Sequence, residues 1–148
     1  MKASWLRFGM NLWPPFRGCG IRVKRIADDY REVEVELVRT RLNRNYIGTH
    51  FGGSLYAMTD PFYMLMLIHA LGPEYFVSHK SGEIEYLKAS REKVYARFSL
   101  DDAVVADIKA RTAGGEKYLP RFAVDVKTAA GDLVARVAHT LYVRRKSN

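Results

Sequence analysis

Five residues between positions 45 and 60 could take part in chemistry: Asn45, His50, Gly52, Gly53 and Asp60. Gly52-Gly53 stands immediately before an apolar segment that predicts a helix. The free backbone N–H groups at a helix start, together with the helix dipole, can stabilise an oxyanion or a polarised carbonyl. Because glycine has no side chain, a ligand can approach that backbone closely.

Asp60 lies within an apolar stretch, between residues 55–58 and 62–65. A carboxylate in such surroundings has either a stabilising partner or a raised pKa, and both are features of a functional acid or base. Asn45 and His50 lie upstream and could orient a carbonyl or a water. Alternatively, Asp60-Pro61 caps a new helical segment after a kink, and His50 is a hydrogen-bonded structural residue. Gly52-Gly53 could likewise serve only a tight turn and close packing.

The spacing of the glycines and the aspartate has a consequence for assembly. Gly52 and Asp60 are eight residues apart, which corresponds to about 12 Å of helix rise. One helix cannot bring both groups to the same carbonyl. If both act on one substrate atom, they come from two chains, and the site lies at the interface of a homodimer.

The elements that must position these residues follow from hydropathy patterns. Residues 54–71 have few polar side chains and predict a helix that is buried on all sides. Residues 32–37 alternate glutamate with valine or leucine, which predicts a strand with one wet face. Residues near 21–23, 76–88, 93–100, 119–128 and 133–145 predict further strands, with a hairpin turn at 129–132.

Two shorter helices complete the prediction. Asp101-Asp102 is expected to cap one whose apolar side holds Val104, Val105 and Ile108. Residues 1–13 predict an N-terminal amphipathic helix. We expect its Trp5, Phe8 and Leu12 side to cover an edge of the core, with membrane or partner contact as the alternative.

The links between most strands are too short for parallel crossovers. The simplest arrangement is an α+β fold, an antiparallel sheet wrapped around one long central helix, with a short N-terminal helix. Residues 1–148 are expected to form a single domain. In it, His69 reads as a hydrogen-bonded core residue, whereas His79 and His139 lie in predicted strands whose pattern suggests no role.

Composition excludes several classes of protein. A single cysteine, Cys19, rules out an internal disulfide, and one Cys with four scattered His rules out a usual zinc site. The longest apolar run, 62–68, is far shorter than the ~20 residues that span a bilayer. We therefore expect no metal, no membrane span and a cytoplasmic location.

The net charge of +8 is unevenly distributed. Residues 1–50 carry ten bases and five acids, residues 51–100 five of each, and residues 101–148 nine and six. This distribution is unfavourable for a nucleic-acid-binding domain, and no nucleic-acid motif is present. It is compatible with a few phosphate contacts. The candidate bases are Arg39, Arg41, Arg91 and Arg144.

The stretch from Asn45 through Gly52-Gly53 to Asp60 resembles the signature of hotdog-fold acyl-CoA thioesterases of the phenylacetyl-CoA thioesterase type. Residues 81–88 resemble the strand that follows in that family, and the ending 140–145 looks like a bacterial branch of the superfamily. The resemblance implies a hotdog fold, a homodimer or homotetramer, and hydrolysis of an acyl-CoA or acyl-carrier thioester. No cofactor is implied beyond the coenzyme A of the substrate.

The same resemblance implies roles for individual residues. Gly52 would offer its N–H to the thioester carbonyl, with Gly53 beside it. Asp60 of the other subunit would act as nucleophile or as general base, and Asn45 would position substrate or water. The chain departs from the family pattern at two positions. Phe51 stands where the family has a histidine, and the histidine of this chain, His50, is displaced by one residue. Asp60 is followed by a proline, where related enzymes usually have an ordinary helix former. These departures favour the alternative function, a non-catalytic acyl-CoA or lipid-binding hotdog protein.

Overall fold

The computed structural model describes residues 1–147, which form seven strands and five helices. The strands are β1 (Ile21–Ile26), β2 (Glu32–Leu37), β3 (Tyr75–Tyr86), β4 (Val94–Ser99), β5 (Lys117–Tyr118), β6 (Arg121–Thr128) and β7 (Leu133–Arg145). The helices are α1 (Ala3–Leu12), α2 (Pro14–Cys19), α3 (Gly52–Ala57), α4 (Phe62–Leu71) and α5 (Asp102–Arg111).

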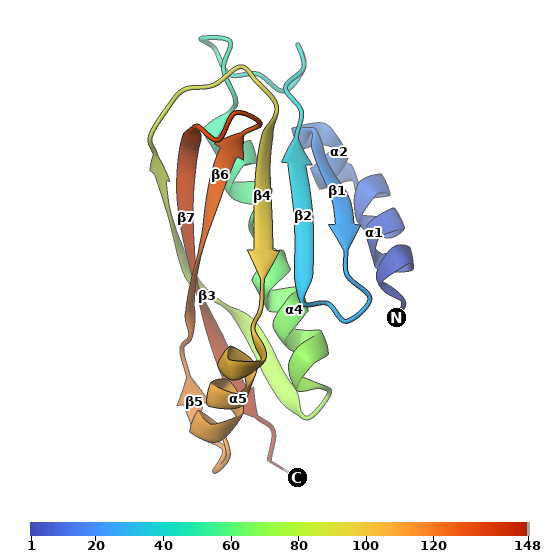
Figure 1. Cartoon of the computed structure of the whole chain (residues 1–148), viewed down its shortest axis with the longest axis vertical. Helices are drawn as coiled ribbons and strands as arrows, with labels where there is room; N and C mark the ends of the chain where they lie inside the picture. The colour runs from blue at the N-terminus through green and yellow to red at the C-terminus, as the bar shows by residue number, and fades with distance from the viewer. Residues whose placement is uncertain (148) are drawn as a thin grey trace.

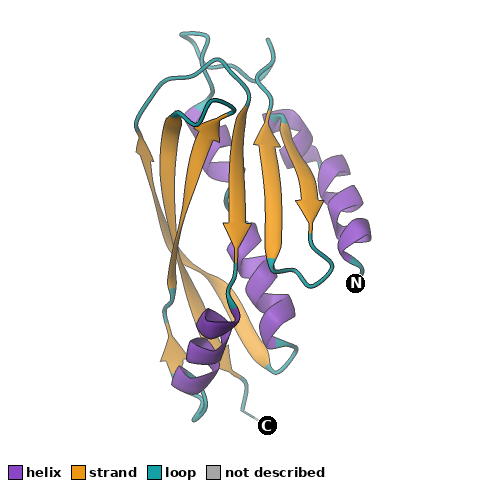
Figure 2. Cartoon of the chain, in the orientation of Figure 1, coloured by secondary structure: helices purple, strands orange, loops and turns teal. Residues whose placement is uncertain are grey.

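All strand pairs are antiparallel, in the order β1-β2-β4-β6-β7-β3, and the short β5 pairs with β7. Helices α3 and α4 run along one face of this sheet (Figures 1 and 2). The predicted antiparallel sheet with a helix packed against it is therefore confirmed. The predicted strands match β1 to β4, β6 and β7, while the two-residue β5 was not predicted.

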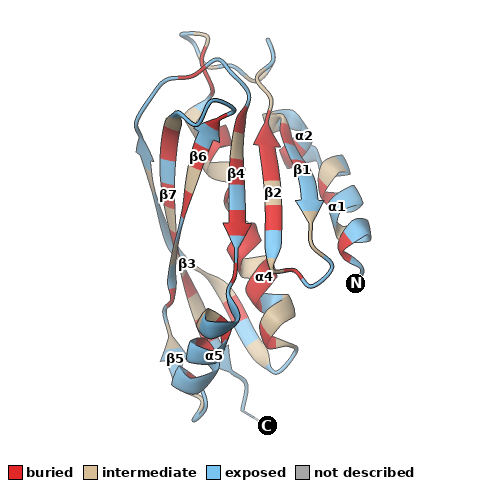
Figure 3. Ribbon diagram, in the orientation of Figure 1, coloured by how far each residue is buried: buried red, intermediate tan, exposed pale blue. Residues whose placement is uncertain are grey.

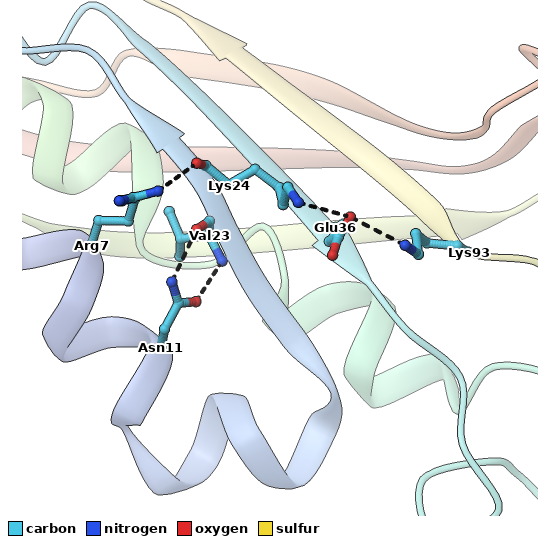
Figure 4. Close-up of polar contacts among 6 residues, drawn as sticks. All are labelled: Arg7, Asn11, Val23, Lys24, Glu36 and Lys93. Atoms are coloured by element: carbon cyan, nitrogen blue, oxygen red, sulfur yellow. Dashed lines mark hydrogen bonds and ion pairs between the residues drawn. The ribbon is translucent and has the colours of Figure 1, made fainter. Parts of the chain in front are cut away.

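Strand β2 shows how the sequence alternation produces the sheet. Val33, Val35 and Leu37 are buried, as the period of two predicts. Glu36 is an exception to the predicted wet face, because it is only 4% exposed. Its carboxylate lies 3.9 Å from Lys24 Nζ and 3.5 Å from Lys93 Nζ (Figure 4). Two cations on neighbouring segments thus accompany the buried charge.

The central helix is interrupted, so the prediction of one helix over residues 54–71 is confirmed only in part. Helix α3 ends at Ala57 and α4 begins at Phe62. Pro61 has no N–H to donate inside a helix, and it instead occupies the N-cap position of α4. Its carbonyl accepts the first bond of α4, from the Leu65 N–H at 2.9 Å. A new helical segment therefore starts after a kink.

The core fills the space between the interrupted helix and the sheet (Figure 3). Met58, Phe62, Met66 and Leu67 are fully buried there. Phe62 and Phe98 of β4 pack with ring centroids 5.0 Å apart. These side chains hold both halves of the helix against the same sheet face, and the break between the halves is consequently fixed in position.

Helix α1 lies along the outer side of β1, at one end of the sheet (Figure 1). The Asn11 side chain donates to the Val23 carbonyl at 3.0 Å and accepts from the Val23 N–H at 2.8 Å, as another strand would (Figure 4). The expectation that Trp5, Phe8 and Leu12 cover the core is wrong, because all three are exposed. The edge of β1 has backbone groups that need partners, and the polar side of α1 bonds those of Val23 and Lys24.

The remaining elements agree with the prediction. Val105 and Ile108 of α5 are buried, and the turn at 129–132 joins β6 to β7, with Gly131 at φ 92°. Among residues 1–147, no helix is long and apolar enough to cross a membrane.

Candidate functional site

Asp60 stands in the break between α3 and α4. Its side chain is half-buried, and within residues 1–147 it has no hydrogen-bond or ion-pair partner. Burial raises the pKa of Tyr56 and lowers the pKa of His139, and the negative charge of Asp60 acts to raise both. Asp60 is therefore a free carboxylate beside two other titratable groups.

The turn that carries Asp60 is attached to the sheet by a buried polar pair. The Thr59 hydroxyl donates to the Tyr56 carbonyl at 2.8 Å, and its Oγ1 lies 2.9 Å from His139 Nε2. Since the hydroxyl proton is used, His139 donates from Nε2, and its Nδ1 is the atom without a partner. Thr59 and His139 are both 0% exposed.

Burial lowers the pKa of His139, and a positive charge on His79 would lower it further. The centroids of the two imidazole rings are 5.6 Å apart, and the ring planes are inclined at 66° to each other. Within the described chain, the buried Nε2 of His79 also has no partner. The environment therefore favours neutral His139 at the helix break.

Tyr56 completes this cluster by lying across strand β3. A Cβ atom on Gly82 would overlap the Tyr56 hydroxyl oxygen and lie 2.9 Å from the ring carbon Cζ. Gly82 is paired with His139 in the register of β3 and β7. The absence of a side chain at Gly82 thus allows the Tyr56 ring to reach within 5.4 Å of the His139 ring. Burial raises the pKa of Tyr56, and Asp60 raises it further.

The other candidate group is at the start of α3, where Gly52 is the first helical residue. A Cβ on Gly52 would lie 2.9 Å from the Tyr86 hydroxyl, which extends from the end of β3. A Cβ on Gly53 would lie 2.6 Å from the ring of Phe51. The helix start therefore has a phenol on one side and an exposed aromatic ring on the other.

Asn45 and His50 hold the loop that leads to Gly52. Asn45 Nδ2 donates to Thr49 Oγ1 at 2.8 Å and to the His50 carbonyl at 3.1 Å, and its Oδ1 accepts from the Thr49 N–H at 2.9 Å. His50 is buried and donates from Nε2 to the Glu92 carbonyl at 2.6 Å. Burial lowers the pKa of His50. The hydrogen-bonding groups of Asn45 are thus engaged within the loop, as is Nε2 of His50.

The four candidate phosphate-binding arginines separate into two groups. Arg39 Nε donates to the Arg91 carbonyl at 3.0 Å, Arg91 lies near Gly48, and the exposed Arg41 belongs to the same loop before α3 as Arg39 and Gly48. Arg144 is opposite Phe76, at the far end of β3 from Tyr86. Ten residues of strand separate those ends, or roughly 30 Å.

Sequence reasoning missed Tyr56, Thr59, Tyr86 and His139. For His139 a signal exists, since β7 buries every second residue at 135, 137, 139, 141 and 143. A histidine at the centre of such an inward face is a buried polar group that needs partners. For Tyr56, Thr59 and Tyr86 the sequence has no comparable signal. His69 is hydrogen-bonded as predicted, because its Nδ1 donates to the Leu65 carbonyl at 2.8 Å, but it is half-buried and not part of the core.

Solved structures share this fold over nearly the full chain. A protein of unknown function from Pseudomonas aeruginosa, described as a "Probable Thioesterase", has a TM-score of 0.87 at 13% identity, covering 99% of this chain and 97% of its own. A thioesterase from Haemophilus influenzae has a TM-score of 0.70 at 16% identity, covering 98% and 92%. A protein of unknown function from Chlorobaculum tepidum has a TM-score of 0.74 at 14% identity, covering 99% and 98%.

The hotdog-type fold expected from the sequence resemblance is thereby confirmed. No curated protein matches the sequence. A family model does match it, over residues 2–143, and the family is described as a domain of unknown function (DUF4442). Because this match spans nearly the whole chain, the protein is a member of the DUF4442 family.

Proposed function

We propose that this protein hydrolyses an acyl thioester. The observation that carries the proposal is Asp60, a half-buried carboxylate without a partner in the described chain, held at a helix break by the buried Thr59–His139 pair. A buried hydrogen-bonded pair is costly to disturb, so it fixes the adjacent backbone. The shared fold with a Haemophilus influenzae thioesterase supports the same reaction class.

Hydrolysis of a thioester places negative charge on the carbonyl oxygen as water attacks the carbonyl carbon. In our proposal, the Gly52 N–H at the start of α3 stabilises that oxygen. In one route, Asp60 takes a proton from the attacking water, the carbon–sulfur bond breaks, and the thiolate of the carrier leaves and receives that proton. In the other route, Asp60 attacks the carbonyl itself and expels the thiolate, and water then hydrolyses the resulting acyl-aspartyl anhydride to release the acid. The Tyr86 hydroxyl, beside Gly52, is a second donor that can reach the same oxygen.

The proposed site needs two copies of the chain. Gly52 lies at the start of α3, and Asp60 lies beyond the end of that helix. Within one chain, the two residues are too far apart to act on the same carbonyl. Strand β3 is the last strand of the sheet and pairs with β7 on one side. Its other side has unpaired backbone groups within the described chain, suited to pairing with a second copy. Such an isologous contact would set Asp60 of one copy towards Gly52 of the other.

The carrier of the acyl group is proposed to be coenzyme A or an acyl-carrier protein, both of which bring phosphate. Arg39 and Arg41 belong to the loop before Gly52 and Arg91 lies beside it. These are the bases we assign to that phosphate. Phe62 and Met66 are 1% and 0% exposed. They fill the core rather than line an open acyl tunnel, so the acyl group must bind along the interface.

A panel of acyl-CoA esters of increasing chain length, assayed with wild type and Asp60→Asn, tests the proposal. We expect wild-type turnover of at least one ester and a loss of at least a hundredfold in Asp60→Asn. The matched control is Asp28→Asn, which makes the same charge change on an exposed turn. Unchanged turnover in Asp60→Asn, in protein that melts like wild type, would overturn the assignment of Asp60.

A second candidate function is binding of acyl-CoA or lipid without hydrolysis. It is favoured by the Phe51 ring, which lies against Gly53 at the start of α3. In that position the ring can shield the helix start from water. Calorimetric binding of an acyl-CoA ester without release of free thiol, across the same panel, would select this function over hydrolysis.

A further inference from the structure

Helix α1 has an apolar side whose residues are largely exposed and lie outside the hydrophobic core. Trp5, Phe8 and Leu12 are 67%, 59% and 51% exposed. They are spaced three and four residues apart, so they share one side of the helix. Met1 and Trp13, at 79% and 49% exposed, flank them. We call these five residues the aromatic ridge.

The ridge points outward because the other sides of α1 are held by the sheet. Asn11 makes two hydrogen bonds with Val23, and Arg7 Nη1 donates to the Lys24 carbonyl at 3.1 Å (Figure 4). Ala3 and Met10 are buried against the core. Rotating α1 to bury the ridge would break these bonds. The fold therefore presents two tryptophans and a phenylalanine to the surroundings of the molecule.

The segment that bears the ridge is strongly basic. Residues 1–27 contain no Asp or Glu, and their six bases are Lys2, Arg7, Arg17, Arg22, Lys24 and Arg25. A groove of about 670 Å³ runs beside α1, and Arg7, Arg17, Arg22 and Lys24 line it. Lys24 and Arg25 pair with Glu36 and Glu32. Within residues 1–147, Arg7, Arg17 and Arg22 have no carboxylate partner.

We propose that this surface binds a membrane rich in anionic lipids, with the ridge inserted among the acyl chains and Arg17 and Arg22 at the headgroup phosphates. Tryptophan favours the boundary between headgroups and acyl chains, and adjacent bases add attraction to anionic lipid. At ten residues, α1 is about half the length that spans a bilayer. The protein would therefore lie on the membrane surface.

Charge decides between a lipid surface and a second copy of the chain. An isologous contact through the ridge would bring the same unpaired arginines of both copies together, and like charges repel. An anionic lipid surface neutralises them instead. The strand order also places β1 and β3 at opposite ends of the sheet. The ridge beside β1 is consequently independent of any pairing through β3, and this inference does not rest on the proposed function.

Tryptophan fluorescence tests the proposal directly, because both tryptophans of the chain belong to the ridge. The wild-type protein is mixed with vesicles of phosphatidylglycerol and phosphatidylcholine, or with vesicles of phosphatidylcholine alone. We expect a blue shift and co-flotation with the anionic vesicles, and a strong reduction of both at high salt. No binding to anionic vesicles, or equal binding to both kinds, would overturn the proposal.

Paired variants separate the two parts of the surface. Phe8→Ser/Leu12→Ser keeps both tryptophans and should lower the partition coefficient by roughly tenfold or more. Arg17→Gln/Arg22→Gln should lower it by a similar factor, at roughly fivefold per base. The controls are Leu119→Ser and Lys109→Gln/Lys117→Gln, exposed positions away from α1 that should bind like wild type.

Sedimentation without lipid tests the second-copy alternative. We expect Phe8→Ser/Leu12→Ser to have the same oligomeric state as wild type. Conversion of a wild-type oligomer to monomer by this variant would show that the ridge is covered by another copy, and would overturn membrane binding. Thermal melting by circular dichroism should be unchanged, since both side chains are exposed.

Discussion

The Nε2 atom of His139 lies 2.9 Å from the Oγ1 atom of Thr59, and both residues are fully buried. This contact joins strand β7 to the break in the central helix, across 80 positions of sequence. It holds the turn that carries Asp60.

Thr59→Val should destabilise the fold by about 1–3 kcal/mol, because the variant removes the hydroxyl and leaves buried His139 Nε2 without a partner. Urea unfolding at neutral pH measures this loss. Thr112→Val is the matched control: Thr112 is equally buried, but its hydroxyl donates to the Ile108 carbonyl, which also accepts the Thr112 N–H. Equal losses in the two variants would contradict a specific role for the Thr59–His139 pair.

The stability of the protein should fall as pH drops below about 6.5. Burial lowers the pKa of both His139 and His50 in the folded protein, whereas the unfolded chain titrates near 6.5. Between 6.5 and each lowered value, only the unfolded state binds the proton. Each histidine therefore contributes a slope of up to about 1.4 kcal/mol per pH unit in that window. Above about pH 6.5, neither histidine contributes to the slope.

His139→Gln tests the pH dependence through urea unfolding between about pH 7.5 and 5.5. In this variant, the dependence of the free energy of unfolding on pH should lose the contribution of one histidine, and the same should hold for His50→Gln. In a variant that combines both substitutions, the free energy of unfolding should change little with pH in this range. A slope in His139→Gln equal to that of wild type would show that His139 does not retain a lowered pKa in solution.

Substitutions of two glycines should have opposite effects on stability. Gly82→Ala places a Cβ against the Tyr56 ring, so the ring must move, at a cost of about 1–3 kcal/mol. Gly9→Ala has open space around its Cβ and lies within α1. It should stabilise by about 0.5–1 kcal/mol. Thermal melting of both variants checks the signs, and an unchanged melting temperature in Gly82→Ala would contradict the observed packing of Tyr56.

Asn11→Ala should release the edge of β1, because both hydrogen bonds to Val23 are lost. We expect a loss of about 1–2 kcal/mol and faster hydrogen exchange at the Val23 amide. Ser4→Ala, on an exposed position of α1, is the control and should leave that exchange rate unchanged. Retained protection of Val23 in Asn11→Ala would mean that other contacts are sufficient to hold α1.

Tyr86→Phe should lower kcat for thioester hydrolysis by about tenfold or more, if its hydroxyl stabilises the same oxygen as the Gly52 N–H. The measurement is steady-state hydrolysis of the best acyl-CoA ester, with kcat and KM separated. Tyr95→Phe, on β4, is the control. A change in KM alone would assign Tyr86 to substrate binding and not to the reaction.

The sequence by itself determined most of the strands and the hairpin that joins β6 to β7. The alternation in residues 32–37, the short links and the turn at Gly131 restrict the chain to an antiparallel sheet, since these are local properties of the backbone. The same holds for the position of Gly52 before a helix, and for a break beside Pro61, which the sequence left as an alternative.

Only the tertiary structure decided which groups meet. Tyr56, Gly82 and His139 come together because β3 and β7 pair in one register and the helix break lies over them. No local pattern encodes a contact across such separations. The outward side of α1 was likewise decided by the edge of β1, whose unpaired backbone groups bind Asn11 and leave Trp5 exposed. Hydropathy predicts that a helix has two sides, but the packing partner determines which side is buried.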